Sequence, residues 1–479
     1  MGLTIFIKRF LPPLIQQLVL LALLAGCSAV GPDYQPDAAL PTASQWQAPL
    51  PHAGSTAKLT DWWAQFQEPT LLTLQEAAAT THPNLQRALA AIQEARAAVV
   101  SRQSDGRPKA DGSASAMRLG DHSNTTPEST AYTVEVDAQW ELDLFGGVRR
   151  ATEAATARLA GRENSWHDAR VTLAAEVASK YLQERACRQL QDLSLQDLNS
   201  RRESARLTAL AVTAGLTAPV DLNQARAREA ESSSALLAQQ ALCEGIVKSL
   251  VTLTGLAEPE LRSLLGAAKA AIPTPAAFVV ESLPADLLAQ RPDLAALERE
   301  LAAASADIGL AEANRYPRLM LLGSLSLSSL QTASRTLNSQ PWSLGPALLL
   351  PLLDGGGRSA RVEEARARFS QAQARLMAAI RAAVEEVELA LVNLESSRHR
   401  RTEAHASSQE YAANLHSLEK HWRAGGISLL VLADGQRGLT HARRNEIVLQ
   451  RDHVQAWITL YKALGGGWHP TPPADHKGA

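Results

Sequence analysis

Three cysteines carry the most distinctive chemistry in this chain of 479 residues. Cys27 ends the run Leu24-Ala25-Gly26-Cys27, which resembles a lipobox, where the cysteine thiol is the nucleophile that receives diacylglycerol. The apolar run 14–24 before it is too short to cross a bilayer but suits the core of a signal peptide. Ser28, rather than an aspartate, favours sorting to the outer membrane, where acyl chains such as palmitate anchor the chain. The alternative is an ordinary secretory signal with a chance cysteine.

The other two cysteines, Cys187 and Cys243, lie at equal distances in sequence on either side of Gly215. If Gly215 marks the turn of an antiparallel helical hairpin, both cysteines lie at a similar height. A disulfide between the two helices is then feasible, and an oxidising periplasm would allow it. The alternative is that both are small buried apolar residues.

No pattern in the chain indicates catalysis. The 12 histidines are scattered singly, and no HExxH or paired CxxC spacing predicts a metal site. The run "LDGGGRSA" from Leu353 follows a strand-like segment but lacks the lysine of a phosphate-binding loop, so a strand-to-helix hinge is the better interpretation. A net charge of -2 does not favour a nucleic-acid partner. We therefore expect no enzyme and no cofactor beyond the covalent lipid on Cys27.

Repeated segments within the sequence indicate which helices and strands carry these residues. Five segments recur in the same order with offsets of 209 to 213 residues, among them "ELDLFGGVRRATEAATARL" and "LLDGGGRSARVEEARARF". Each copy predicts a helix, a strand pair and two very long helices joined by a turn. The predicted division is a signal peptide 1–26, a lipidated tether 27–61, a first repeat 62–270, a linker 271–290, a second repeat 291–468 and a tail 469–479. The predicted strands cover 109–144 and 318–353, and the predicted long helices cover 147–254 and 357–464.

The strand pair has the pattern of a membrane barrel. From Tyr132 to Leu144 apolar and polar residues alternate without a fault, which puts an apolar face against lipid and an acidic, polar face against water. About 13 residues tilted near 45° span roughly 30 Å. Four strands cannot close a barrel, and open edges are not tolerated in lipid, so copies must combine. The alternative is a half-buried strand of a soluble sheet.

These motifs, in this order, resemble one family over nearly the whole mature chain. They are "CSAVGPDYQP", "DWWAQFQEPTLLTLQEAA", "WELDLFGGVRRA", "LLAQRPDLAALERELAAA", "LGPALLLPLLDGGGRSA", "LADGQR" and "LYKALGGGW". The chain resembles the outer-membrane factors of tripartite efflux pumps, the TolC-like proteins, in their NodT-type lipoprotein branch. The resemblance implies a mostly α fold of two tandem repeats, each a β-hairpin and a long helical hairpin. Three copies would form a twelve-stranded transmembrane β-barrel continued by a periplasmic α-barrel of coiled-coil pairs. Leu353 and Gly435 depart from the family pattern, where an aromatic residue and an alanine are usual.

The same resemblance identifies gate residues. Asp434 and Arg437 of "ADGQR" match positions at which the family closes its duct, and Asp221 is their counterpart in the first repeat. We expect these groups to form ion pairs and hydrogen bonds between helices, which adaptor binding would pull apart. The alternative for Asp221, and also for Asp434, is a role as a helix N-cap.

The resulting functional prediction is a passive exit duct for small toxic molecules, as in drug resistance. It would be a homotrimer in the bacterial outer membrane, lipid-anchored, with a large periplasmic part. Its partners would be outer-membrane lipid, a periplasmic adaptor (membrane fusion) protein and an inner-membrane transporter of the resistance-nodulation-division type. Two alternatives remain at this stage. One is a lipid-tethered coiled-coil scaffold without a pore, and the other is an exit duct for type I protein secretion.

Overall fold

The computed structural model describes residues 29–35, 47, 62–120, 128–268, 271–275 and 290–468. The predicted signal peptide 1–26, Cys27 and the tail 469–479 lie outside the described residues. So do nearly all of the tether, most of the linker 271–290 and residues 121–127 of the predicted strand pair 109–144. The chain forms two compact units: one contains 1–38, 90–163 and 296–377, and the other contains 39–89, 164–295 and 378–479. Each unit draws on both predicted repeats, so one repeat is not one compact unit.

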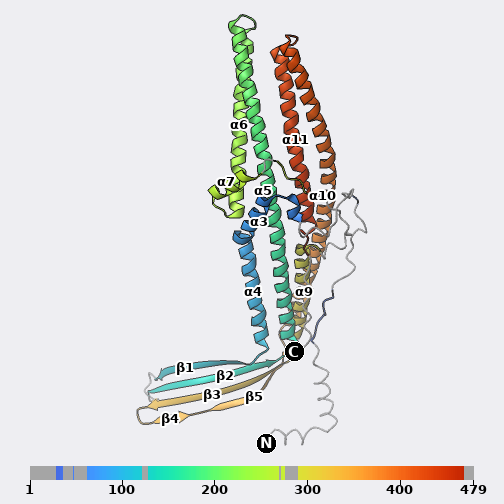
Figure 1. Ribbon diagram of the computed structural model, residues 1–479. Coiled ribbons are helices and arrows are strands. Elements are labelled where there is room, and N and C mark those ends of the chain that lie inside the picture. The colour runs from blue at the N-terminus through green and yellow to red at the C-terminus, as the bar shows by residue number, and fades with distance from the viewer. Residues whose placement is uncertain are drawn as a thin grey trace. The chain divides into compact units, whose positions relative to one another are not determined.

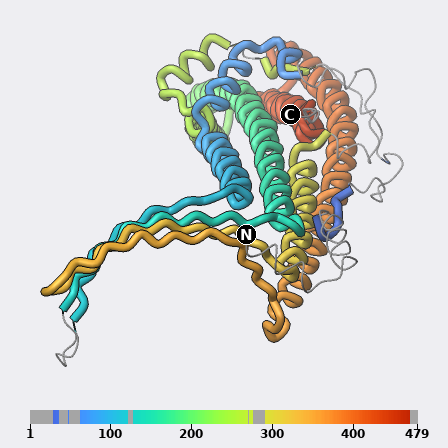
Figure 2. The backbone as a smooth tube through the Cα atoms, turned by 90° about the horizontal axis from the view of Figure 1, so that it is seen from below, coloured from blue at the N-terminus to red at the C-terminus, as the bar shows by residue number. Residues whose placement is uncertain are grey.

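The first unit contains a five-stranded antiparallel sheet (Figures 1 and 2). Its strands are β1 (Lys109–Leu119), β2 (Ser129–Leu142), β3 (Arg318–Thr332), β4 (Thr336–Ser339) and β5 (Trp342–Leu349). β2 pairs with β1 and β3, and the far edge of β3 pairs with β4 and then β5. Among the described residues, β1 and β5 each have a neighbour on one side only. The sheet therefore has two open edges.

The register confirms the predicted alternation. On one face, Val134 of β2 lies opposite Leu327 of β3, and Val136 lies opposite Leu325. On the other face, Glu135 lies opposite Ser326 and Asp137 opposite Ser324. Trp342 of β5 extends the apolar face. One face of the sheet is thus apolar across β2, β3 and β5, while the other is polar and acidic.

The strands end earlier than predicted because an aspartate after each one caps a helix. β2 stops at Leu142, and Asp143 accepts hydrogen bonds from Val148 N (3.1 Å) and Arg149 N (3.0 Å) at the start of α5 (Gly147–Thr213). β5 stops at Leu349, and Asp354 accepts bonds from Gly356 N (3.1 Å) and Arg358 N (2.9 Å) at the start of α10 (Gly357–Arg423). The predicted strand ends at 144 and 353 were therefore too late. The aspartates satisfy amide groups that a helix N-terminus leaves free.

Two short elements were not predicted at all. Residues 336–339, inside the predicted strand pair 318–353, form the separate short strand β4 on β3 after a turn at 333–335. After α6 (Pro219–Thr254), the chain forms α7 (Glu258–Ala267), whose ten residues carry too few turns for a clear helical period.

The remaining helices follow the order predicted for each repeat. Pro83 divides the first predicted helix into α3 (Pro69–Thr81) and α4 (Pro83–Asp105). The second repeat contributes α9 (Pro292–Ala313), α10 and α11 (Leu429–Ala463). Within the second unit, α5 with α6 and α10 with α11 form two helical hairpins (Figure 1). By length and mean hydropathy, α6 alone among the described helices could cross a membrane. Its disulfide to α5, described below, places it in a hairpin instead.

An aromatic cluster and a buried arginine hold the second unit together where its helices begin and end. Trp62, in the short helix η2 (Trp62–Phe66), is fully buried and stacks on Tyr461 of α11, with ring centroids 4.6 Å apart. Arg291 forms ion pairs with Asp293 (2.8 Å) and Glu386 (2.7 Å) and donates to Ala463 O (3.0 Å). The motifs "DWW" and "RPDL" therefore clamp segments that are distant in sequence.

Candidate functional site at the helical turns

The two hairpin turns have the same backbone construction. Gly215 and Gly425 adopt left-handed conformations with φ of 70° and 74°. The next amide in each turn, from Leu216 and Gly426, donates back to the carbonyl five residues earlier. Glycine is favoured there because other residues pay a steric penalty at positive φ. The turns thus place the starts of α6 and α11 at equivalent positions in the two hairpins.

Asp221 lies in the first turn of α6 but does not cap it. The N-cap residue is Ala218, which has no side-chain cap, and Asp221 accepts a 2.5 Å hydrogen bond from Thr217 Oγ1. The N-cap alternative for Asp221 was therefore wrong. A carboxylate at this position still favours the helix because the helix N-terminus carries partial positive charge.

Asp434 and Arg437 pair with each other on α11, three residues apart. Their side chains are 68% and 45% exposed. Within the described residues neither has a hydrogen bond or ion pair to a second helix. Asp434 is not the N-cap of α11, because Ser428 is, and its Oγ accepts from Val431 N. The role of the pair between helices therefore stays a prediction.

The contact between the two hairpins comes from Gln436, which sequence reasoning missed. Ser200 Oγ of α5 donates a 2.6 Å hydrogen bond to Gln436 Oε1 of α11. Two more bonds join the same helices further along: Arg444 donates to Ser194 Oγ (3.1 Å) and Gln455 donates to Ser179 Oγ (2.9 Å). We call these three bonds the α5–α11 seam. The one sequence feature that could have indicated this seam is the position of Gln436 inside the motif "ADGQR".

Two glycines bring α10 and α11 close together beside the same motif. A Cβ on Gly435 would overlap Leu418 Cδ1, and a Cβ on Gly438 would lie 2.7 Å from Tyr411 Cε1. Leu418 is flexible at its end, whereas the ring of Tyr411 is stiff, so Gly438 is the stricter requirement. Gly435, where the family usually has an alanine, thus allows the close approach of Leu418 in this chain.

A cavity of about 380 Å³ lies beyond the seam, between the α5/α6 turn and the first turn of α11. Its charged lining is Arg201, Asp221 and Arg228, and its apolar lining includes Leu216 and Leu429. Asp221 therefore lies on the wall that faces the second hairpin. Asp221, the gate candidate of the first repeat, therefore lies near the start of α11. Among the described residues, no hydrogen bond or ion pair joins it to Asp434.

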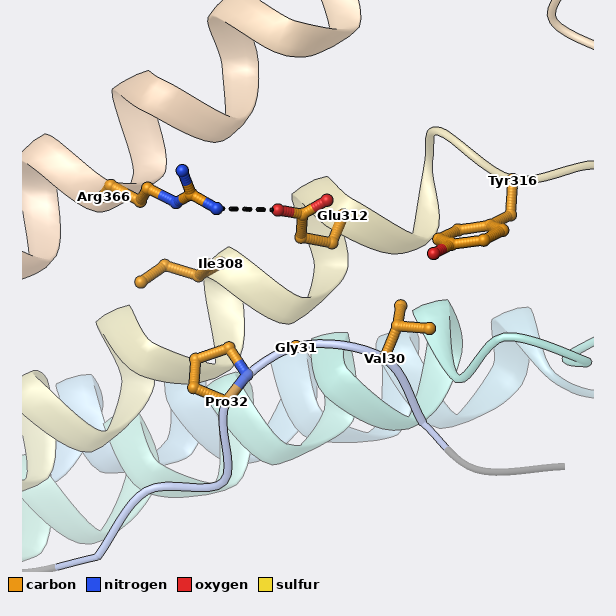
Figure 3. A pocket seen from close by; sticks show the side chains of 7 residues that line it. All are labelled: Val30, Gly31, Pro32, Ile308, Glu312, Tyr316 and Arg366. Carbon is orange, nitrogen blue, oxygen red and sulfur yellow. Dashed lines mark hydrogen bonds and ion pairs between the residues drawn. The ribbon is translucent and has the colours of Figure 1, made fainter. Parts of the chain in front are cut away.

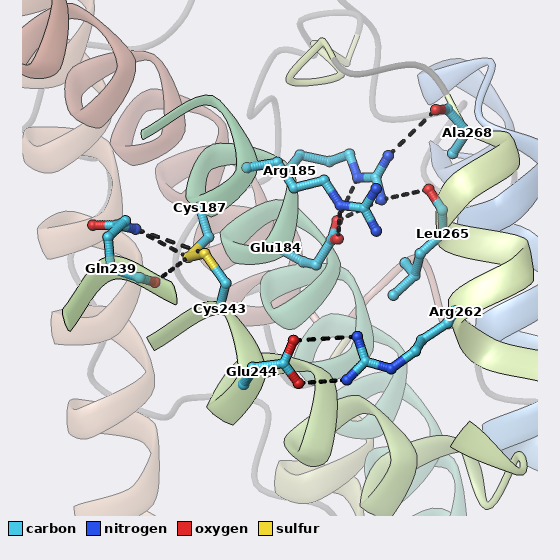
Figure 4. Close-up of polar contacts among 10 residues, drawn as sticks. Glu184, Arg185, Cys187, Gln239, Cys243, Glu244, Arg262, Leu265 and Ala268 are labelled. Atoms are coloured by element: carbon cyan, nitrogen blue, oxygen red, sulfur yellow. Dashed lines mark hydrogen bonds and ion pairs between the residues drawn. A yellow bond between two sulfur atoms is a disulfide. The ribbon is translucent and has the colours of Figure 1, made fainter. Parts of the chain in front are cut away.

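Cys187 and Cys243 form a disulfide that joins α5 to α6, with Cα atoms 5.6 Å apart (Figure 4). Gln239 Nε2 donates to Cys187 Sγ at 3.1 Å. Two residues before Cys187, the fully buried Arg185 pairs with Glu184 and donates to Leu265 O (3.0 Å) at the end of α7. The disulfide and Arg185 together attach both α6 and α7 to α5.

In the first unit, the residues that follow the predicted acylation site are bound by Arg150. We call the segment Ala29–Gln35 the N-terminal strap. Arg150, with a side chain 5% exposed, donates to Val30 O (3.1 Å), Gly31 O (3.3 Å) and Asp33 (2.6 Å). A cavity of about 380 Å³ lies beside the strap, with the Arg366–Glu312 ion pair (3.1 Å) on its far wall (Figure 3). The strap is therefore an ordered part of the first unit.

The fold and the helical hairpins define an outer-membrane channel protein, and comparisons with known proteins agree. A family model described as "outer membrane efflux protein" matches residues 74–256 and 283–466. The chain belongs to this family, and the two matched segments correspond to the two repeats.

Similar relatives are named for different roles. Nodulation protein T of Rhizobium leguminosarum bv. viciae is 30% identical over 477 residues, covering 94% of this chain and 92% of the relative. The pyoverdine export outer membrane protein OpmQ of Pseudomonas putida is 30% identical, covering 95% and 97%. The solved outer-membrane channel OprN superimposes with a TM-score of 0.77 at 28% identity, covering 92% and 100%. The open-state channel MtrE of Neisseria gonorrhoeae, at 23% identity and a TM-score of 0.78, supports the fold alone. This chain is accordingly an outer-membrane efflux channel protein with a large periplasmic helical part.

Proposed function

We propose that the protein is the exit duct of a tripartite efflux pump and that it works as a homotrimer. The observation that carries this proposal is the sheet with one apolar face and two open edges, β1 and β5. Unpaired backbone groups in lipid cost several kcal/mol each, so other copies must close the sheet. Closure around the polar face of the sheet produces a water-filled path through the membrane.

Cargo would pass along the polar face without chemical change. The relatives' names refer to pyoverdine, solvent and toluene export, and a duct of this kind suits small molecules in general. The chain needs no cofactor for this role. Energy would come from an inner-membrane transporter of the resistance-nodulation-division type, joined through a periplasmic adaptor.

The adaptor would bind the hairpin turns. Large apolar side chains are exposed there: Leu216 is 81% exposed, Val220 is 67% and Leu430 is 56%. Exposed apolar groups on the same surface indicate a protein contact. The gate would lie directly behind them, with Asp434, Arg437 and Asp221 as its charged residues and the α5–α11 seam as its hydrogen-bonded part. Adaptor binding would open the gate by separating the hairpins.

The anchor would be diacylglycerol and an acyl chain on Cys27. This is supported by the strap, because the chain is already held against α5 and α9 three residues after that cysteine. The acyl chains would therefore enter the membrane beside the sheet. Metabolic labelling with a palmitate analogue, lost in Cys27→Ala, tests this anchor.

The function is tested with purified full-length protein. Heat-resistant trimers on a gel and discrete conductance steps in planar bilayers are the expected results. Asp434→Ala with Arg437→Ala is expected to raise the conductance, because a surface ion pair contributes about 0.2–1 kcal/mol and symmetric copies add. Glu419→Ala with Arg423→Ala, a pair near the end of α10, is the matched control. A monomer that forms no pore would overturn the proposal and favour the tethered scaffold.

A further inference from the structure

A charged cavity in the first unit has no role in the fold described so far. It measures about 350 Å³ and lies where the starts of β1 and β3 meet α4, α5 and α9. Its charged lining consists of Arg102, Asp105, Arg107, Lys109, Glu141 and Arg318. Four cations therefore face two carboxylates in one small volume.

The carboxylates neutralise only part of this charge. Asp105 pairs with Lys109 (2.8 Å) and Arg102 (3.6 Å), which together hold the pKa of the Asp105 carboxyl below its usual range. Glu141 lies 4.0 Å from Arg318. The Arg107 side chain has no hydrogen-bonded or ion-paired partner in the part of the chain that the structure describes. An anion entering the cavity thus meets an unused guanidinium group with five donors.

The strand register places the cavity on the water side of the sheet. Lys109 pairs with Gln139, which pairs with Leu322, and Glu141 pairs with Met320. Lys109, Gln139 and Glu141 share the polar face with Glu135 and Asp137. If the apolar face meets lipid, the cavity opens into the duct at the periplasmic end of the barrel. This step rests on the proposed function.

The sign of the charge reverses further along the same face. Asp111 follows Lys109 by two residues, or about 7 Å, and it lies directly opposite Asp137. Glu135 lies opposite Ser113 on the next polar position. Like charges directly opposite destabilise a strand pair, so no folding advantage explains this arrangement. The cation-rich cavity and the acidic strand positions therefore form two zones of opposite potential.

We propose that the cavity is a transit site that binds the anionic group of cargo, a carboxylate or sulfonate on a small organic molecule, as it enters the membrane part of the duct. Arg107 binds the anion, and Lys109 and Arg102 raise the local potential. The acidic zone beyond repels the same group, which keeps binding weak and release fast. Binding in a duct must be weak for transport to continue.

The test measures the local potential with charged thiol reagents. Gln139→Cys places a thiol in the cavity and Ser113→Cys places one in the acidic zone, both at exposed positions. Purified full-length trimer is treated with an anionic sulfonatoethyl or a cationic trimethylammonioethyl methanethiosulfonate, and peptide mass spectrometry follows the introduced cysteine. A unit charge about 7 Å away in water changes the local concentration of a monovalent ion about threefold. The anionic-to-cationic rate ratio should therefore be at least about fivefold higher at Gln139→Cys than at Ser113→Cys.

Two further measurements connect the potential to Arg107 and to binding. Arg107→Gln in the Gln139→Cys background should lower the rate ratio about ninefold, because the threefold change acts in opposite directions on the two reagents, whereas Arg335→Gln, in the β3–β4 turn, should leave it unchanged. Millimolar benzoate should slow the anionic reagent at Gln139→Cys and not at Ser113→Cys. Equal ratios at the two positions, or no effect of benzoate, overturns the transit site. Absence of pores in the unmodified trimer would instead overturn the proposed function, so the two failures are distinguishable.

Discussion

Replacing Gly31 by alanine should release the N-terminal strap from the first unit. Gly31 has a φ of 94°, and a Cβ built on it would overlap the Cα of Gly309 and lie 3.0 Å from Gly309 N. Both atoms belong to the backbone of α9, which cannot rotate away as a side chain can. Next to this contact, Val30 N donates to Phe145 O at 3.1 Å. The methyl group therefore cannot be accommodated while the strap remains docked.

The size of the effect follows from the smaller of two costs. Keeping the strap docked would require a left-handed alanine, at roughly 1–2 kcal/mol, together with the backbone overlap. Releasing the strap removes three acceptors from the buried guanidinium of Arg150 and leaves Glu153 (2.8 Å) as its remaining ion-pair partner. A hydrogen bond to a charged group contributes about 1.5–3 kcal/mol, and the bonds from Arg150 to Val30 O and Gly31 O are both lost. We take about 3 kcal/mol as the loss of docking free energy, which is a factor of more than 100.

Hydrogen exchange of a peptide covering residues 29–35 measures this docking directly. In the purified protein, Gly31→Ala should speed the slowest exchange in that peptide about 100-fold. Gly245→Ala is the matched control, since nothing lies near its Cβ position in the interior of α6. Asp33→Asn should have a smaller effect, because the Asp33 side chain is largely exposed. Exchange within fivefold of the unchanged protein for Gly31→Ala would refute the argument that Arg150 and Gly309 require the docked strap.

Three further predictions concern the second unit. Cys187→Ser with Cys243→Ser should lower the thermal midpoint of the α5/α6 hairpin, since a bridge that spans 56 residues contributes about 4 kcal/mol in the chain-entropy model. Thermal unfolding followed by circular dichroism, with and without reductant, checks this, and equal midpoints would contradict it. Gln436→Ala and Ser200→Ala should each raise the conductance by removing the same bond of about 1 kcal/mol, and the double variant should add nothing more; additive effects would show that the bond is not shared. His453 is buried, and desolvation lowers its pKa to about 4, so the unfolded state binds more protons between about pH 6.5 and 4. Folding stability should fall as the pH drops through that window, and His453→Gln should flatten the dependence in melts at pH 7 and pH 5.

Patterns that repeat along the chain were predictable, and single contacts were not. The alternation from Tyr132 onward identified both faces of the sheet, because a strand has a period of two whatever its partner. The equal spacing of Cys187 and Cys243 about Gly215 placed both at one height, because a helix has a constant rise. By contrast, nothing local distinguishes the buried Arg150, Arg185 and Arg291 from the other arginines. Their burial depends on carbonyls and carboxylates that are distant in sequence.

For the candidate gate residues too, the sequence predicted the region of the contact but not the side chain that makes it. The three-residue spacing of Asp434 and Arg437 already favoured a pair on one helix, since side chains three apart are neighbours on a helix surface. The expectation of a bond between helices came from the family resemblance. Of the three bonds in the α5–α11 seam, the one nearest the turns belongs to Gln436, one residue from Arg437. A motif therefore located the right turn of α11, but only the packing of α11 on α5 determines which of its side chains reaches across.

The two repeats use the same kinds of helix cap and glycine turn, but their helices are joined differently. Asp143 and Asp354 both accept backbone hydrogen bonds at the starts of α5 and α10, although from different positions, and Gly215 and Gly425 form equivalent turns. The α5/α6 pair is then bound covalently through Cys187, so those helices cannot slide past each other at that height. The α10/α11 pair has no disulfide among the described residues, and near the turn it is held by side chains of α10 packed over glycines of α11. Packing contacts can be exchanged without breaking a covalent bond. Sliding of the two helices past each other at the height of that bridge should therefore be greater in the second hairpin than in the first.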